Sequence, residues 1–176
     1  MEHTAKKTRE LVLASLLTAA TAVLAQIMLP IGPVPFNLAV LGAYLAGCLL
    51  EPVWALASMA AYLLLGAFGL PVFAGFSGGP AILAGPTGGY IVGYLLIALF
   101  TALAAKHGKD PLWTAAAMAA GLLACYALGT GWFMIVTGRS LPESLALCVL
   151  PFVIPDACKA AAALLLSRAM RARLRR

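Results

Sequence analysis

The stretch Pro155-Asp156-Ala157-Cys158-Lys159 places two charges at the start of the last apolar run of the chain, residues 155–167. Asp156 and Lys159 are three positions apart, so on a helix they share one face. A charged side chain at the centre of a bilayer costs about 2.5–3.5 kcal/mol on insertion scales, so such residues face the protein interior or a water-filled cavity. The pair is either an ion pair that fixes helix packing or a polar anchor for a small ligand.

The composition is that of a membrane protein. Of 176 residues, 63% are hydrophobic and 10% are charged, whereas ordinary soluble domains carry about 25% charged residues. The net charge of +6 does not indicate nucleic-acid binding, because ten of the twelve Lys and Arg residues lie in the two tails and one short loop; the other two are Arg139 and Lys159. Such clusters are topology signals. We therefore predict one multi-pass domain, residues 1–176, in the lipid bilayer.

Six apolar segments approach or reach the length of about 20 helical residues that crosses a bilayer. Turn-forming or charged breaks separate them, and the first break, 30–35, holds three prolines and cannot continue a helix. The sequence thus predicts an all-α integral membrane protein of six transmembrane helices, at approximately 11–29, 36–50, 53–68, 88–105, 112–136 and 145–170.

The connection 69–87 is unlike an ordinary loop. Eight of its 19 residues are Gly or Pro and none is charged, although exposed loops are usually polar. Irregular backbone at membrane depth is tolerated where it is buried in protein or lines a cavity. We expect this outer loop to fold back and cap a ligand site, with a purely structural re-entrant loop as the alternative. Its candidate ligand-binding residues are Phe73, Phe76, Ser77, Gly78 and Gly79.

The charge asymmetry predicts the orientation in the membrane. With both tails in the cytoplasm, the inside holds the ten clustered cations and the outside only Arg139, which agrees with the positive-inside rule. The breaks 30–35, 69–87 and 137–143 then all face outward, as does the start of the last helix with its charged pair. We expect a plasma-membrane protein whose site captures a molecule from outside the cell.

Small residues recur four positions apart in the first apolar segment, as Ser15 with Ala19 and Thr18 with Ala22. Small residues at this spacing let two helices pack closely in lipid. The strip therefore serves either packing inside the protein or docking of another membrane protein. In the second case the candidate docking residues are Ser15, Ala19 and Ala22.

Three motifs give the chain a resemblance to a known family. They are Pro33-Val-Pro35 through Leu45-Ala-Gly47, Gly69-Leu-Pro71-Val-Phe73 through Gly85-Pro86-Thr87-Gly-Gly89-Tyr90, and Pro155-Asp156-x-x-Lys159. Together with the six-span layout, they make the chain resemble the BioY family, the substrate-binding S components of energy-coupling-factor (ECF) biotin transporters. Many members follow the first Pro-Val-Pro with an apolar residue, Thr, Leu and Gln. This chain has Phe36-Asn37-Leu38-Ala39 instead, and we take Asn37 as the substitute for the missing Gln.

The resemblance implies biotin as the transported ligand, with Asp156, Lys159, Asn37 and Tyr90 among its contacts, and no cofactor. Biotin has an apolar bicycle, a ureido group with two donors and one acceptor, and a carboxylate. Small-ligand sites are mostly apolar with a few placed polar groups. Asp156 and Lys159 fit the ureido group as acceptor and donor, or Lys159 holds the carboxylate; both arrangements stay open.

The resemblance also implies partners. S components pack their first helix, through Ala-xxx-Ala, onto a transmembrane coupling subunit that works with two ATPase subunits. This chain has only the Ser/Thr/Ala variant of that pattern. The sequence G-x-x-x-x-G-K-[ST] is missing, so ATP hydrolysis falls to the partner subunits.

Three alternatives fit parts of the sequence. An S component for another vitamin shares the layout and differs in the loop residues. An integral membrane enzyme needs a catalytic constellation, but the sequence has no HExxH and no paired carboxylates, and we expect no metal site. A scaffold protein has no need of an intramembrane Asp/Lys pair or an uncharged glycine-rich loop.

Overall fold

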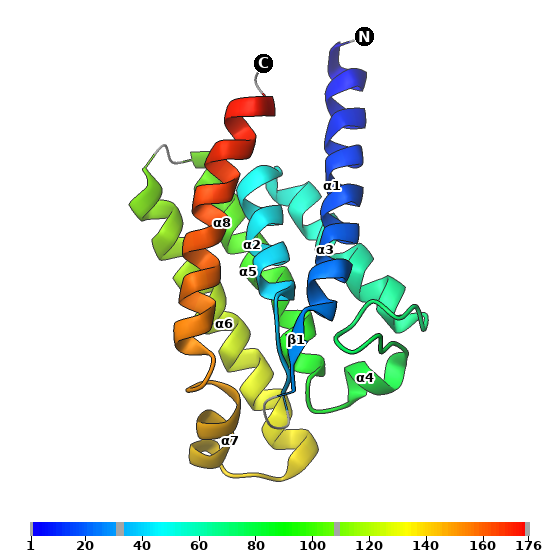
Figure 1. Ribbon diagram of the computed structural model, residues 1–176, viewed down its shortest axis with the longest axis vertical. Coiled ribbons are helices and arrows are strands. Elements are labelled where there is room, and N and C mark those ends of the chain that lie inside the picture. Colours follow the sequence, from blue (N-terminus) through cyan, green and yellow to red (C-terminus); the bar gives the residue numbers. More distant parts are fainter. Residues whose placement is uncertain (1, 31–33, 108–109, 175–176) are drawn as a thin grey trace.

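The computed structural model describes residues 2–30, 34–107 and 110–174, which form a bundle of helices with one long axis (Figure 1). The first and last described residues lie at one end of the bundle, here named the terminal end, and β1, α4 and α7 lie at the other, here named the loop end (Figure 1). The elements in chain order are α1 (Glu2–Gln26), β1 (Met28–Leu29), β2 (Phe36–Asn37), α2 (Ala39–Leu49), α3 (Pro52–Ala67), α4 (Pro80–Ala84), α5 (Gly88–His107), α6 (Pro111–Thr137), α7 (Leu141–Cys148) and α8 (Val153–Leu174).

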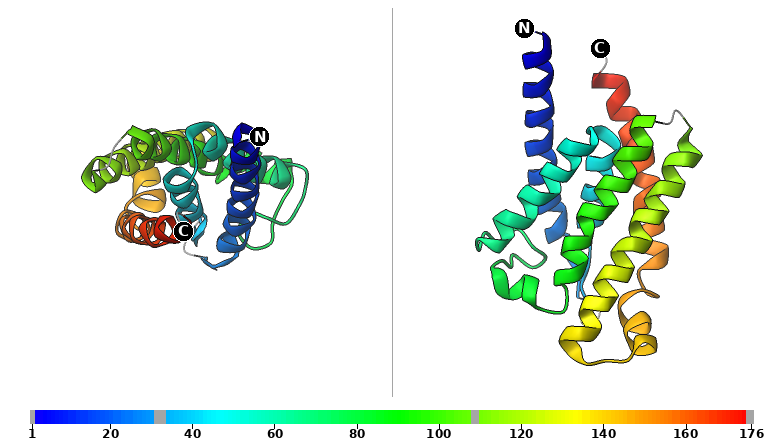
Figure 2. Two further views of the ribbon diagram at one scale, coloured as in Figure 1. Left: turned by 90° about the horizontal axis from the view of Figure 1, so that it is seen from above. Right: turned by 180° about the vertical axis from the view of Figure 1, so that it is seen from behind.

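α2 lies at the centre of the bundle, between α1 and α8 and against α5 (Figure 2). Nine of its eleven residues are buried. Glycines let the neighbouring helices come close: a Cβ at Gly42 would lie 2.3 Å from Oγ1 of Thr21, and one at Gly47 would lie 2.5 Å from Cβ of Thr101. Close approach of this kind provides the dispersion contacts that hold helices together in lipid, where the hydrophobic effect between helices is missing.

The helix lengths agree with a multi-pass membrane protein. α1, α5 and α6 are long and apolar enough to cross a bilayer, and α7 and α8, bent by 48° at their junction, make a fourth candidate when taken together. α2 and α3, with 11 and 16 residues, are shorter apolar helices. The predicted all-α architecture is confirmed, and the six predicted spans correspond to these six units. The bounds of α3, α5 and α6 agree with the predicted 53–68, 88–105 and 112–136 within two residues.

The connection after α1 is a small hairpin. Residues 28–29, predicted as helix, instead pair antiparallel with Phe36–Asn37, also predicted as helix. The prolines of the 30–35 stretch explain the early end of α1, because proline neither donates a backbone hydrogen bond nor lets the preceding residue stay helical with ease. Asn37 then accepts a hydrogen bond through Oδ1 from the N–H of Ala39, where α2 begins.

The last predicted span, 145–170, is broken in the structure. α7 ends at Cys148, and α8 begins at Val153 and runs on to Leu174. Pro151 lies in the gap, and Pro155 falls in the first turn of α8, where its missing N–H is tolerated. The break turns α7 across the loop end of the bundle (Figure 1), and it brings the N-terminal turn of α8, with its two charges, inside the protein.

The 69–87 connection folds back onto the protein, as predicted. It contains the short helix α4 and a tight turn bridged between Phe73 and Ser77. The Phe73 ring lies against α3 where Gly66 has no side chain; a Cβ there would lie 2.0 Å from Cζ of the ring. The N–H of Gly79 donates to the carbonyl of Gly66 at 2.7 Å, which returns the loop to the same helix.

Candidate functional site

The predicted charged pair is buried at the start of α8. Asp156 is 3% exposed and Lys159 is 5% exposed, and Nζ of the lysine lies 2.6 Å from Oδ1 of the carboxylate. A buried ion pair is sensitive to loss of one partner, because the remaining charge is then left without compensation in a medium of low polarity. The protein interior therefore holds one hydrogen-bond donor, the Lys159 ammonium, and one acceptor, the Asp156 carboxylate, one helical turn apart.

Two further side chains complete the surroundings of the pair. The hydroxyl of Tyr126 on α6 donates to Oδ2 of Asp156 at 2.7 Å. The ammonium of Lys159 lies 4.1 Å from the centroid of the Phe36 ring on β2, an arrangement in which the ring face attracts the cation. The pair is thus held from α6 and from the hairpin as well as from α8.

Two neighbouring cavities lie on this side of the bundle, and the smaller one borders the pair. The smaller, of about 40 Å³, is lined by Asp156, Lys159 and Tyr126 among others. The larger, of about 120 Å³, is lined by Phe73 and Ser77 of the folded loop. Both cavities are lined by the same five residues, which therefore separate them: Val34, Pro35, Asn37, Tyr90 and Tyr94. The two cavities form one candidate site, charged at one end and capped by an aromatic loop at the other.

The predicted site residues fall into two groups. Asp156, Lys159, Asn37 and Tyr90 line the smaller cavity, and Phe73 and Ser77 line the larger one together with Asn37 and Tyr90. Phe76, Gly78 and Gly79 lie outside both linings. The Phe76 side chain is 73% exposed and its φ is 54°, so its ring is directed away from the cavities. A Cβ on Gly78 would lie 2.3 Å from the carbonyl oxygen of Leu70, which indicates that this glycine serves the fold of the loop.

Tyr90 and Phe73 are positioned by glycines and neighbouring side chains. The Tyr90 hydroxyl shares a hydrogen bond of 2.9 Å with Oγ1 of Thr130, and its ring lies where Gly129 has no side chain. Phe73 packs edge-on against Tyr62 with ring centroids 5.5 Å apart, a favourable geometry for aromatic pairs. Both rings are therefore fixed before any ligand is considered.

Gln26, the last residue of α1, holds the folded loop and was not among the residues predicted from the sequence. Its Nε2 donates to the carbonyls of Val72 at 3.2 Å and Phe73 at 3.1 Å, and its Oε1 accepts from the N–H of Phe76 at 2.7 Å. The last bond explains how Phe76 keeps a positive φ that non-glycine residues rarely adopt. The signal for Gln26 in the sequence is that it is an amide side chain directly after the uncharged run 11–25.

Tyr126 and Tyr44 are the other residues that sequence reasoning missed. The Tyr44 side chain is fully buried on α2, and its hydroxyl has no hydrogen-bond partner within the described part of the chain. It lies within electrostatic range of Asp156. A buried polar group without a partner costs about 1–3 kcal/mol, and Tyr44 is not among the residues that line the two cavities. In the sequence, each of these two residues stands out as a tyrosine within an apolar helix. The sequence alone does not show which side of the helix faces the protein interior.

The predicted docking strip on α1 borders an open groove. Ser15, Ala19 and Ala22 line an apolar hollow of about 510 Å³ between α1 and α3, with Trp54 and Val72 on its other sides. The inward face of α1 is used differently: Thr18 donates to the carbonyl of Ser58 at 3.0 Å, which fixes α1 against α3. The small residues of α1 therefore fall into two groups. Thr18 packs inside the protein, while Ser15 and Ala19 border the open groove.

The fold and the site together define a multi-pass helical membrane protein with a partly charged candidate ligand site under a folded loop. The family model described as the BioY family matches residues 1–176, so this chain belongs to the BioY family. This confirms the resemblance drawn from the motifs.

Individual relatives agree with the family match. The chain is 42% identical over 161 residues to a protein of Pyrococcus horikoshii named probable biotin transporter BioY, covering 92% of this chain and 95% of that one. It is 38% identical over 159 residues to the biotin transporter BioY of Thermotoga maritima, covering 90% and 94%. Its structure matches, with a TM-score of 0.87 and 28% identity over 95% of this chain and 93% of the other, a crystal structure of the S-component for biotin from an ECF-type ABC transporter.

Proposed function

We propose that this chain is the biotin-binding S component of an ECF-type transporter and that it takes up biotin. The observation that carries the proposal is the buried Asp156–Lys159 pair at one end of a capped, aromatic-lined site. Biotin needs such a site, because its bicycle is apolar while its ureido group and carboxylate both require hydrogen-bonding partners. The names of the family relatives favour a transporter over a membrane enzyme.

In the proposed complex, Asp156, Lys159 and Tyr126 meet one polar end of biotin, and Phe73 covers the bicycle. Asn37 and Tyr90 line both cavities and contact the middle of the ligand, while Ser77 contributes from the loop. Phe76, Gly78 and Gly79 act through the shape of the loop that holds Phe73.

Binding in this site requires movement of its walls. The cavities of about 40 and 120 Å³ are small beside the 300–1,000 Å³ typical of ligand pockets. The five shared residues named above lie between the two, so displacement of Val34, Pro35 and Asn37 would join the cavities into one volume.

The orientation proposed is cytoplasmic for both termini. The ten clustered cations support it through the positive-inside rule, and the charged pair lies toward the end of the bundle remote from the termini. Single cysteines in a cysteine-free background test the orientation. Labelling of Ser140→Cys by an impermeant reagent from outside, with Lys106→Cys protected, is expected; the reverse pattern contradicts it.

The partners proposed are a transmembrane coupling subunit and two ATPase subunits. The coupling subunit occupies the groove beside Ser15, Ala19 and Ala22, because an open apolar hollow next to small residues is suited to the close approach of a helix in lipid. Nucleotide hydrolysis belongs to the ATPase subunits.

Isothermal titration of the purified protein in detergent tests the substrate. Biotin is expected to bind tightly, and thiamine and riboflavin are expected not to bind. No heat with micromolar biotin, from a sample whose cooperative thermal unfolding shows that it is folded, rejects biotin as the substrate; binding of another vitamin instead supports an S component of different specificity.

A second titration decides which end of biotin meets the charged pair. Biotin amide lacks the carboxylate charge but keeps the ureido group. If Lys159 holds the carboxylate, the amide binds the wild type more weakly than biotin does, and Lys159→Met removes that difference. If the pair holds the ureido group, Lys159→Met weakens both ligands by the same factor.

A further inference from the structure

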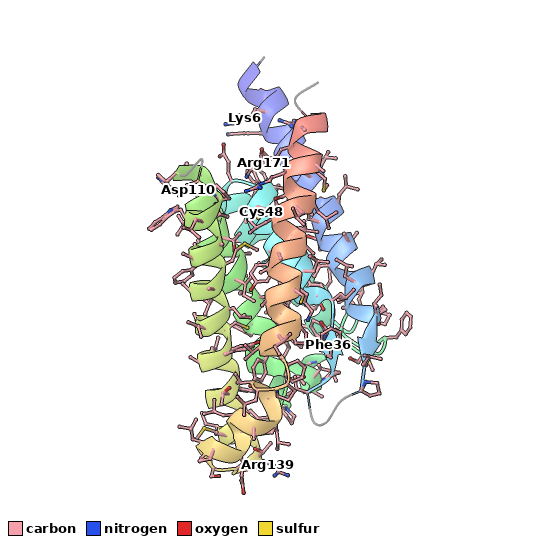
Figure 3. All side chains as sticks on the ribbon, turned by 60° about the vertical axis from the view of Figure 1, so that its left-hand side comes forward. Lys6, Phe36, Cys48, Asp110, Arg139 and Arg171 are labelled. Atoms are coloured by element: carbon pink, nitrogen blue, oxygen red, sulfur yellow. The ribbon has the colours of Figure 1, made fainter. Side chains whose placement is uncertain are left out.

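A second hollow lies at the terminal end of the bundle, away from the proposed biotin site. It has a volume of about 650 Å³ and lies where α5 ends, α6 begins and α8 approaches its last turns. Figure 3 shows Arg171, Cys48 and Asp110 at this end of the molecule and Arg139 at the opposite end. The residues that line the hollow are Cys48, Ala105, Lys106, His107, Pro111, Thr114, Leu164, Ser167, Arg168 and Arg171.

The hollow has an excess of positive charge. Lys106, Arg168 and Arg171 line it, and its lining holds no carboxylate. The carboxylates described nearby are engaged elsewhere: Glu51 pairs with Lys6 at 2.7 Å, and Asp110 accepts from a backbone N–H in the first turn of α6. The hydrogen bond from Lys6, the charge of Lys6 and, less strongly, the charge of Lys106 lower the pKa of the Glu51 carboxyl, so Glu51 is engaged chiefly by Lys6 and only in small part by Lys106.

Arg168 and Arg171 differ in what they bind. The guanidinium of Arg171 donates to the carbonyl of Cys48, which ties the end of α8 to the end of α2. Arg168, one turn earlier on α8, lines the same hollow and makes no hydrogen bond or ion pair with the described residues. The guanidinium of an arginine matches the oxygens of a phosphate group in geometry and charge. Lys106, on α5, supplies a second cation to the same space.

The flanks of the hollow carry exposed apolar side chains. Leu112 and Trp113, at the start of α6, are 75% and 59% exposed, and Leu165 and Leu166 on α8 are 67% and 46% exposed. Tryptophan is enriched where the hydrocarbon of a membrane meets its headgroups. The hollow thus opens at headgroup level between two helices whose outer surfaces are apolar.

We propose that this hollow binds the phosphate of an anionic phospholipid. Arg168 and Lys106 hold the phosphate, Arg171 contributes its charge while bound to α2, and the acyl chains lie along the exposed leucines of α6 and α8. Basic pockets between transmembrane helices are suited to such headgroups, because the phosphate replaces counterions that the cations otherwise need. The lipid would link the ends of α5 and α8, which the chain itself does not connect at this point.

The test uses the full-length protein, stripped of lipid in a neutral detergent, and short-chain phosphatidylglycerol as the probe. Its affinity is measured by native mass spectrometry and by the rise in thermal stability, beside phosphatidylcholine of the same chain length. Phosphatidylglycerol is expected to bind the more tightly. Lys106→Gln with Arg168→Gln is expected to weaken it by roughly 25-fold, at about fivefold for each cation removed.

The matched control is Lys7→Gln with Arg139→Gln, which removes the same charge outside the hollow and is expected to change the affinity by less than about threefold. Biotin affinity serves as the check that both double variants are folded. An equal loss in the control pair overturns the proposal in favour of unspecific attraction. Glycerol phosphate that binds as tightly as the lipid overturns it in favour of a soluble phosphate. Loss of coupling-subunit pull-down with lipid affinity unchanged makes the hollow a protein-docking surface instead.

Discussion

Tyr126 on α6 donates a hydrogen bond of 2.7 Å to Oδ2 of Asp156 on α8, across 30 residues of sequence. The other oxygen of the same carboxylate accepts from Lys159 at 2.6 Å. Because the two bonds come from different helices, they fix both the position and the rotation of the carboxylate. The acceptor for a ligand is therefore oriented by the protein alone.

The Tyr126→Phe variant tests this relationship. It keeps the ring and removes the hydroxyl, so that Asp156 loses a charge-assisted hydrogen bond worth about 1.5–3 kcal/mol. We expect biotin affinity to fall by roughly tenfold or more, with a lower melting temperature. Isothermal titration and thermal unfolding in detergent measure the two effects. Unchanged values for both would show that the hydroxyl has no part in holding the carboxylate.

Substitution of the charged pair separates a ligand anchor from a structural ion pair. Lys159→Met removes a charge-assisted bond to the ligand, and we expect an affinity loss of roughly ten- to hundredfold. Asp156→Asn keeps the shape and one acceptor, so a smaller loss is expected. The double variant is expected to bind no better than Lys159→Met alone.

The melting temperatures of the same three variants supply the control for that comparison. A purely structural pair predicts that each single variant is less stable than the double one, because each leaves an uncompensated charge. Near-normal biotin affinity in the double variant would remove both residues from the ligand site.

Gln26 is expected to control how long biotin stays bound. Gln26→Met keeps the length of the side chain but loses its hydrogen bonds to the carbonyls of Val72 and Phe73 and to the N–H of Phe76. Since net hydrogen bonds contribute about 0.5–1.5 kcal/mol each, we expect dissociation on the order of tenfold faster, with association nearly unchanged. Release of radiolabelled biotin into an unlabelled excess measures the rate.

Val23→Ala, on the same helix and 66% exposed, is the matched control for Gln26→Met and is expected to leave dissociation unchanged. If both variants release biotin at the wild-type rate, the loop is held by its other contacts. Those are Phe73 against Gly66 and the bond of 2.9 Å from Nε1 of Trp132 to the carbonyl of Gly85.

The α1–α3 groove is expected to serve the partner and not the ligand. Ser15→Leu and Ala19→Leu place larger side chains in the hollow, in the space where the partner helix is proposed to lie. We expect pull-down of the coupling subunit to fail while biotin affinity stays within about twofold, since large surface changes away from a site usually have small effects on it. Val23→Leu adds bulk outside the groove and is the control. Loss of both activities together would indicate internal packing at these positions.

The sequence predicted the parts of the fold that depend on long apolar runs. α3, α5 and α6 begin and end within two residues of the predicted bounds, because a bilayer requires long apolar helices and the charged or proline-rich breaks end them. Asp156 and Lys159 were selected because their burial in a membrane is costly. Their spacing of three positions predicted that the two side chains share one face of the helix.

The missed features depend on contacts between distant segments. The strands β1 and β2 have only two residues each, too few to leave an alternating pattern. Whether Phe73 or Phe76 faces inward depends on the turn that Gln26 holds, and that residue is 46 or more positions away. Tyr126 is one of several tyrosines in apolar helices, and its partner was identifiable only after α6 and α8 were packed.

Val72 lines the α1–α3 groove and its neighbour Phe73 lines the larger cavity, so the sites proposed for the partner and for the vitamin meet at a single peptide unit. A helix pressed against Val72 moves the peptide that carries Phe73, and a ligand pushing Phe73 outward moves Val72 in return. We therefore expect the two proposed binding events to be thermodynamically linked. Whatever factor the seated coupling subunit applies to biotin affinity, biotin applies the same factor to the affinity for the coupling subunit.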